Sequence, residues 1–291
     1  MHDLLPVIAA GIASGSAYAL LALGIVIIFR STDTVNFALG DIATLAIFIS
    51  LWLLPQGAPS LAILVVAIAV SGSLGVVTER FVIRPLGAGH KSLFIALVVT
   101  IGLGLLIHAA IGAIWGHRPV VIEPIVPGTA MVFGIALTWT KLLGAAIAIV
   151  VMVAVAWFFR YTVFGIAMRA SAEDHYAARI LGIKPARIAM IAWFIGCGLA
   201  AVAAFMLAVD SSLNAHLTLP ALFRAFAGVF LGGLTSMPGA AIGGFAIGVL
   251  DNIAGRYLSA NYRDTIVFAV IVIVLFIKPS GFFGARRAER V

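Results

Sequence analysis

The chain has 291 residues, of which 63% are hydrophobic and only 10% are charged. Because soluble domains carry about 25% charged residues, this composition excludes a soluble enzyme and indicates a membrane protein. The net charge of +7 does not indicate nucleic-acid binding, since the cations lie in short loops between apolar segments. No group of His, Cys or carboxylate residues has catalytic or metal-ligand spacing, and we predict neither kind of site.

Eight apolar segments follow one another along the chain. Most are about 20 residues long, the length at which a helix crosses the ~30 Å hydrocarbon core. Lipid cannot satisfy backbone polar groups, and the runs lack the alternation of barrel strands. We therefore expect an all-α polytopic membrane protein, with one transmembrane domain over residues 1–291 and segments at 6–29, 37–54, 60–78, 92–115, 140–159, 188–209, 221–250 and 264–277.

The first two segments are separated by a stretch that disturbs the apolar pattern. Residues 36–40 read Asn-Phe-Ala-Leu-Gly and are followed by Asp41. We predict a helix break there, which would present polar groups to a solute crossing the membrane. The alternative is that Asp41 is an interfacial residue near a loop. We interpret His108, in the fourth segment, as an interhelical hydrogen-bond partner in preference to a ligand.

Two later regions depart from a simple helical crossing. Residues 116–139 are rich in proline and polar residues, and we expect an external loop with a short inserted or interfacial helix over Ala130–Leu137. The long segment 221–250 is interrupted by two glycines and by Pro238. Because proline cannot continue a helix without losing a hydrogen bond, we predict a re-entrant hairpin or two half-helices there.

The basic residues predict how the chain lies in the membrane. If 221–250 re-enters and the N-terminus is outside, thirteen Lys and Arg residues fall on one side and five on the other. Basic loops remain in the cytoplasm. We therefore place the 80–91 loop, the 160–187 loop and the C-terminus in the cytoplasm of a multi-pass protein.

The 160–187 loop is polar, and it carries signals for a short helix outside the bilayer. We predict Ser171 as its N-cap, with Glu173 and Asp174 in the first turn, and a helix over residues 172–181. Gly182 suits the end of that helix, and Pro185 suits the first turn of the next. Such a helix serves either as a docking element for a partner or as a plain linker.

The same loop resembles the coupling segment of ABC-importer permeases, specifically the branched-chain amino acid permease family of the LivH/LivM type. That family carries arginine-alanine, an acidic pair, two alanines and then leucine-glycine-isoleucine. The matching stretches in this sequence are Arg169-Ala170, Glu173-Asp174, Ala177-Ala178 and Leu181-Gly182-Ile183, with further similarity at residues 11–20, 36–41, 79–86, 232–244 and 278–284. Leu39 departs from the family, which often has histidine at that position.

The resemblance implies a transport subunit of the inner membrane, closer to LivH than to its longer partner. Its partners would be a second, LivM-like permease subunit, two cytoplasmic ABC ATPases that use ATP and Mg²⁺, and a periplasmic substrate-binding protein. The sequence has no phosphate-binding loop of its own, so we predict no cofactor in this chain. The residues that would couple to the ATPases are Arg169, Ala170, Glu173, Asp174, Ala177, Ala178, Arg179 and Gly182.

For the substrate path we expect small polar side chains beside the two predicted helix breaks. The candidates are Ser14, Ser16, Asn36, Asp41, Thr235 and Ser236. Glycines spaced four apart, such as Gly11 and Gly15, are expected to pack helices closely. Branched-chain amino acids are the first substrate that the resemblance implies, with urea, short amides or other small solutes as alternatives. A stand-alone secondary transporter or channel is the alternative from another class, and it would need more mid-membrane carboxylates than this chain has.

Overall fold

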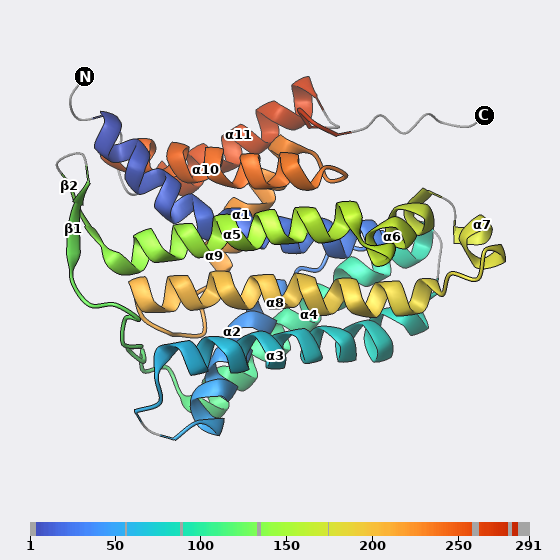
Figure 1. Cartoon of the computed structure of the whole chain (residues 1–291), viewed down its shortest axis with the longest axis horizontal. Coiled ribbons are helices and arrows are strands. Elements are labelled where there is room, and N and C mark those ends of the chain that lie inside the picture. Colours follow the sequence, from blue (N-terminus) through green and yellow to red (C-terminus); the bar gives the residue numbers. More distant parts are fainter. Residues whose placement is uncertain are drawn as a thin grey trace.

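The computed structural model is a bundle of helices that run mostly along one axis (Figure 1). Among the residues that the structure describes, six helical stretches are long and apolar enough to cross a bilayer, so the chain is a multi-pass membrane protein. The structure describes residues 4–55, 57–87, 90–132, 135–173, 175–257, 262–278 and 281–284.

Each of the eight expected apolar segments coincides with one or two helices, which confirms the all-α membrane fold. The first six lie in α1 (Leu4–Thr32), α2 (Leu39–Leu53), α3 (Ser60–Thr78), α4 (His90–Trp115), α5 (Trp139–Tyr161) and α8 (Pro185–Asp210). The last two lie in α9 (Leu219–Gly232), α10 (Met237–Tyr257) and α11 (Arg263–Ile277). A π-helical turn η1 (Glu79–Ile83) and a 3-10 turn η2 (Arg84–Leu86) extend α3, and α6 (Val163–Glu173) and α7 (His175–Ile180) lie in the loop before α8.

Two helices form the core of the bundle. The most apolar part of α1 is 83% buried and that of α8 is 78% buried, whereas α4 and α5 are mostly exposed. The exposed side chains of these outer helices are apolar, such as Leu105 on α4 and Val153 on α5. Lipid is as apolar as these side chains, so exposing them to the bilayer costs little. The outer helices therefore face lipid or another membrane subunit.

Glycine contacts hold the central helices close together. A Cβ atom on Gly248 of α10 would collide with the backbone of Gly15 on α1, and one on Gly243 would collide with Gly228 on α9. These contacts confirm that the small-residue spacings pack helices. The pairs involved are Gly11/Gly15, Gly228/Gly232, Gly239/Gly243 and Gly244/Gly248.

The predicted interruption of segment 221–250 is confirmed. Helix α9 ends at Gly232, Gly233 has a φ of 105°, and α10 begins at Met237. The Ser236 hydroxyl accepts a hydrogen bond from the Gly239 amide at 3.1 Å and so caps the start of α10. Residues 282 and 283 of the C-terminal tail donate backbone hydrogen bonds to the last carbonyls of α9. The two helices form a hairpin whose turn is covered by the tail.

The predicted helix at Ala130–Leu137 is wrong. Strands β1 (Thr129–Val132) and β2 (Ile135–Thr138) form an antiparallel hairpin, with Thr129 opposite Thr138. An isolated helix of eight residues is unstable, whereas β-branched residues such as these favour a strand. Apolar composition alone did not separate the two structures.

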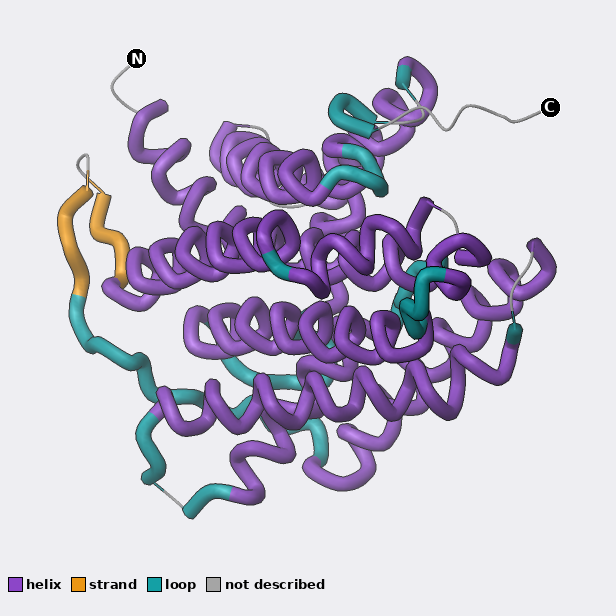
Figure 2. Tube along the Cα trace, turned by 45° about the vertical axis from the view of Figure 1, so that its right-hand side comes forward, coloured by secondary structure: helices purple, strands orange, loops and turns teal. Residues whose placement is uncertain are grey.

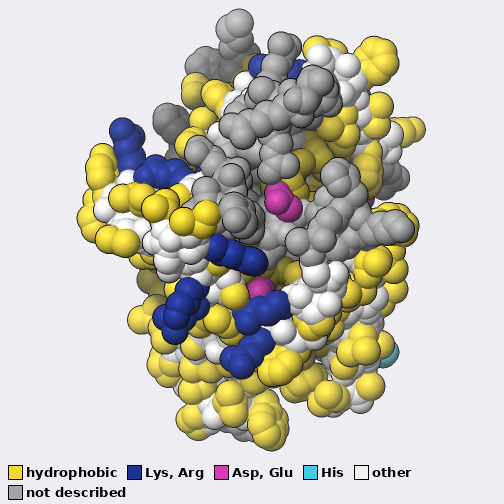
Figure 3. Space-filling model, turned by 90° about the vertical axis from the view of Figure 1, so that its right-hand side faces the viewer, with side chains coloured by type: hydrophobic (Ala, Val, Ile, Leu, Met, Phe, Trp, Pro, Cys, Tyr) yellow, Lys and Arg dark blue, Asp and Glu magenta, His cyan; other side chains and the backbone are white. Residues whose placement is uncertain are grey.

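The bundle has two distinct ends. The start of α1 and the β-hairpin lie at one, which we call the hairpin end, and α6 and α7 lie at the other, the basic end (Figures 1 and 2). Residues 285–291, which carry three of the basic residues predicted to be cytoplasmic, lie outside the described residues. Arg84, after α3, donates a hydrogen bond to the Ala186 carbonyl at the start of α8, which joins the 80–91 and 160–187 regions. Figure 3 looks onto the basic end, where Lys and Arg side chains gather. The predicted topology requires these basic loops to lie at one end, as they do, and the cytoplasmic location of that end stays a prediction.

Candidate functional site

The chain between α1 and α2 is not helical. The break predicted at residues 36–40 is therefore confirmed for the residues before α2 and not for those within it. Asn36 lies in this connection, and Gly40 and Asp41 already belong to the first turn of α2. The Asn36 side-chain oxygen accepts a hydrogen bond from the Ala38 amide at 3.0 Å, which fixes the start of α2. The side-chain nitrogen of Asn36 is buried and has no hydrogen-bond partner among the described residues. A polar donor is thus available inside the bundle.

Asp41 lies beside the centre of α4, a helix long and apolar enough to span a membrane. Its carboxylate oxygen Oδ2 is 2.7 Å from the point where a Cβ atom on Gly104 would stand. Gly104 is close to the centre of α4, about 21 Å along the helix axis from its first residue and about 17 Å from its last. This position along α4 favours the path interpretation of Asp41 over the interfacial alternative. Gly104 has no side chain, and this leaves room for the carboxylate.

Polar side chains from two further elements surround Asp41. His108 of α4 places Nδ1 4.0 Å from Asp41 Oδ1, and its ring lies 4.2 Å from the ring of His216, centre to centre. The hydroxyls of Thr44 and Thr218 share a hydrogen bond of 2.8 Å. We call these side chains the mid-bundle polar cluster, which consists of Asn36, Asp41, Thr44, His108, His216 and Thr218.

The exposure of the cluster increases toward the hairpin end. The Asp41 side chain is 12% exposed, that of His108 is 27% exposed, and His216 is exposed. His216 belongs to the segment between α8 and α9, whose Leu213 pairs with Val120 of the loop before the β-hairpin. Asp41, His108 and His216 of the cluster therefore form a chain of neighbouring polar groups that leads from the exposed His216 into the bundle. Polar groups in this position are costly in lipid and are typical of a solute path.

The other predicted path residues lie elsewhere. Ser14 accepts a hydrogen bond from the Asn252 side chain of α10 at 2.7 Å, and the buried Ser16 donates to the Ala13 carbonyl within α1. Thr235 and Ser236 lie in the turn between α9 and α10. The structure brings Asn36 and Asp41 into one cluster and separates them from these four residues, whose role in a path stays a prediction.

A second buried ionic group ties the C-terminal helices together. Arg224 of α9 pairs with Asp251 of α10 at 3.1 Å and with Asp264 of α11 at 2.8 Å. Its guanidinium also lies 5.9 Å from the centre of the Tyr18 ring on α1. Every charge in this group has a partner, so its geometry is that of a structural link between four helices.

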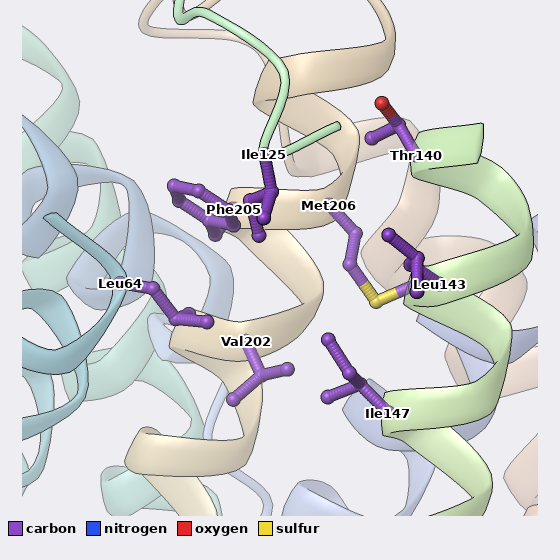
Figure 4. A pocket seen from close by; sticks show the side chains of 9 residues that line it. Leu64, Ile125, Thr140, Leu143, Ile147, Val202, Phe205 and Met206 are labelled. Atoms are coloured by element: carbon purple, nitrogen blue, oxygen red, sulfur yellow. The ribbon is translucent and has the colours of Figure 1, made fainter. Parts of the chain in front are cut away.

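An apolar pocket lies between α3, α5 and α8 (Figure 4). Leu64, Ile147 and Val202 point into it, and Thr140 is the one polar side chain of its lining. Such a pocket offers no groups for a charged or strongly polar solute. The mid-bundle polar cluster is therefore the better candidate for a functional site.

The 160–187 loop differs from its prediction at the N-terminal side. Ser171 is not an N-cap, because α6 begins at Val163 and continues past it. The cap is Thr162, whose hydroxyl accepts a hydrogen bond from the Gly165 amide at 3.2 Å. Both residues have a cap-forming side chain, and the earlier one starts the helix. Asp174 lies outside the described residues, as do the side chains of Glu173 and Ala177.

The end of this loop is as predicted. Gly182 has a φ of 80°, its amide bonds to the Arg179 carbonyl, and the Ile183 amide bonds to the Ala178 carbonyl. This pair of hydrogen bonds is a Schellman motif, which ends α7. Helix α8 then begins at Pro185. Ala178 is buried, whereas Arg179 is exposed.

The sequence matches, over residues 7–275, the protein family described as the permease component of branched-chain amino acid transport systems. The chain belongs to this family. Relatives of this permease include the high-affinity branched-chain amino acid transport system permease proteins LivH of Salmonella typhimurium and of Escherichia coli K12. Each is 30% identical to it over 97% of this chain and 96% of the relative. BraD of Pseudomonas aeruginosa is 29% identical over the same shares.

Family membership places this permease among membrane transport subunits, as its helices already indicate. It is a multi-pass protein of the inner membrane. Sequence reasoning found Asn36 and Asp41 but did not include Thr44, His216 or Thr218 in the site. No local sequence signal joins His108 to Asp41, 67 positions earlier, or to His216, 108 positions later in the chain.

Proposed function

We propose that this permease carries branched-chain amino acids into the cell as the membrane subunit of an ABC-type importer. Its family and its relatives support this class of substrate. The main support for a solute path is the mid-bundle polar cluster. It supplies a carboxylate, two imidazoles, two hydroxyls and an amide inside an apolar bundle. These groups can replace the water around a zwitterion during passage.

The subunit itself is proposed to be non-catalytic. Two cytoplasmic ABC ATPases would use ATP and Mg²⁺, a periplasmic binding protein would deliver the substrate, and a second, LivM-like permease subunit would complete the path. The exposed faces of α4 and α5 are large and apolar enough for lipid and for such a subunit.

The ATPases would dock on the loop from 160 to 187. At the end of α7, Ile180 is 70% exposed and Leu181 is 77% exposed, although both precede the bilayer-spanning α8. Large apolar side chains exposed outside the membrane are typical of a contact surface. Arg179 and Gly182 adjoin them, and the Schellman motif holds the local backbone in a fixed shape.

Reconstitution tests this function. The tagged permease is purified in mild detergent with its co-expressed partners, and the complex is placed in proteoliposomes with a leucine-loaded binding protein. We expect the ATPases to co-purify and leucine uptake to require ATP. Uptake driven by an ion gradient without ATP would instead identify a secondary transporter, and uptake of urea but not leucine would identify a different substrate class.

A further inference from the structure

We propose that Asp41 is the site in the permease path that recognises the ammonium group of the substrate. The path itself, and not only a delivery protein, would then select solutes that carry an ammonium group over neutral amides such as urea. This inference rests on the proposed function, because it assigns the substrate class to one residue of that path.

Asp41 differs from the other buried acids in its counter-ion. Among the described residues three acidic side chains are buried, namely Asp41, Glu79 and Asp251. Glu79 pairs with Arg84 at 2.6 Å, and Asp251 pairs with Arg224 at 3.1 Å. No arginine or lysine in the described part of the chain pairs with Asp41. Its one ion-pair partner there is the His108 imidazole, at the long distance of 4.0 Å.

A carboxylate inside the bundle that has no arginine or lysine partner among the described residues can bind a cation that passes through. Buried charges are normally paired, because removing a carboxylate from water is costly. The two structural acids each have an arginine, so the fold does supply counter-ions where a carboxylate only holds helices together. At Asp41 no arginine or lysine of the described residues fills this position, and the substrate ammonium can fill it during passage.

The cluster also contains a group that can bind the carboxylate of an amino acid. The Asn36 side-chain nitrogen is a fully buried donor without a partner among the described residues, while its oxygen is held by the Ala38 amide. A free amide donor suits a carboxylate. The Thr44 and Thr218 hydroxyls bond to each other, which uses one of their two hydrogens, whereas the Asn36 nitrogen has both of its hydrogens available among the described residues.

The test compares Asp41→Asn with Asp210→Asn in the complete complex. Both variants replace a carboxylate by an amide of the same shape, but Asp210 is half-exposed and pairs with Lys141 at the hairpin end of α8. We expect Asp41→Asn to lower ATP-dependent leucine uptake about tenfold or more, since a hydrogen bond to a charged group is lost. Asp210→Asn should stay within about twofold of the unaltered complex.

A second measurement separates recognition from a structural role. Thermal unfolding of the detergent-purified complex, without binding protein, is followed with millimolar leucine, 3-methylbutylamine (which has no carboxylate) or 4-methylpentanoate (which has no ammonium). We expect leucine and the amine to raise the Tm of the unaltered complex, the acid to have no effect, and Asp41→Asn to abolish both shifts.

The outcomes keep the two hypotheses apart. If the unaltered complex imports leucine but Asp41→Asn imports it within twofold, the inference is overturned and the proposed function stands. The inference is equally overturned if the acid shifts the Tm as much as leucine, or if no ligand shifts it. If the unaltered complex imports no leucine at all, the proposed function fails first.

Discussion

The ion pair between Arg84 and Glu79 ties the end of α3 to the start of α8. Arg84 donates from Nε to Oε1 at 3.2 Å and from Nη2 to Oε2 at 2.6 Å, and Nη2 also donates to the Ala186 carbonyl at 3.2 Å. The Glu79 side chain is only 4% exposed, whereas that of Arg84 is 36% exposed. Replacing Arg84 by alanine therefore leaves a buried carboxylate without its cation.

The expected cost follows from this geometry. Removing one partner of a fully buried ion pair destabilises a protein by about 3–5 kcal/mol. Because Arg84 is partly exposed, water can reach Glu79 in its place, and we expect a loss of about 1–3 kcal/mol. Glu79→Gln removes the charge and keeps the shape, so the double variant should lose less than the sum of the two single variants.

The assay is reversible unfolding of the purified permease in detergent, with Arg80→Ala as the matched control. Arg80 is an exposed residue of η1, next to Glu79, and its guanidinium contacts only the Phe81 ring among the interactions described for it. We expect the control to lose less than about 0.5 kcal/mol. If Arg84→Ala were as mild as Arg80→Ala, the pair would not stabilise the junction of α3 and α8.

Three further predictions concern packing, backbone conformation and coupling. Gly248→Ala should lower stability by about 1–3 kcal/mol because its Cβ atom would collide with α1, whereas Gly102→Ala, with open space around it, should be neutral or stabilising in the same unfolding assay. Gly182→Ala should cost about 1–2 kcal/mol locally, because φ is 80° there, and should speed amide exchange at the end of α7. The pair Glu173→Lys and Asp174→Lys should abolish uptake while membrane insertion, followed by fractionation, is unchanged; normal uptake would show that this loop does not couple to an ATPase.

Much of the fold could be predicted because membrane helices are recognised from their length and apolar composition. The break after Gly232 and the end of α7 at Gly182 were predictable for a different reason, since glycine and proline restrict the backbone locally. The errors at Ser171 and at 130–137 arose where two local structures suit the same residues. In each case a local hydrogen bond decided the outcome, from the Gly165 amide to the Thr162 hydroxyl at the start of α6 and between the adjacent strands β1 and β2 in the hairpin.

The candidate site was harder to predict than the fold. Asp41 and Asn36 lie next to a visible interruption of the apolar pattern, so the sequence indicated them. Thr218 and His216 lie in a polar connection that resembles any other loop. Their place beside α2 depends on how α4 and the segment before α9 pack, and Gly40 permits this because a Cβ atom there would meet the Thr218 hydroxyl. Such contacts between residues far apart in the chain produce no periodic pattern in a single sequence.

The central claim, that the mid-bundle polar cluster lies on the transport path, is tested most directly by thiol accessibility. The single cysteine, Cys197, is buried, and Cys197→Ala provides the background. Thr218→Cys reports on the cluster, and Ser71→Cys is the control, because Ser71 is equally buried but donates to the Cys197 carbonyl between α3 and α8. The account predicts that a small water-soluble thiol reagent modifies the Thr218→Cys variant in the working complex, that leucine slows this reaction, and that the Ser71→Cys variant stays unmodified. Equal protection of both variants during ATP-driven transport would contradict it.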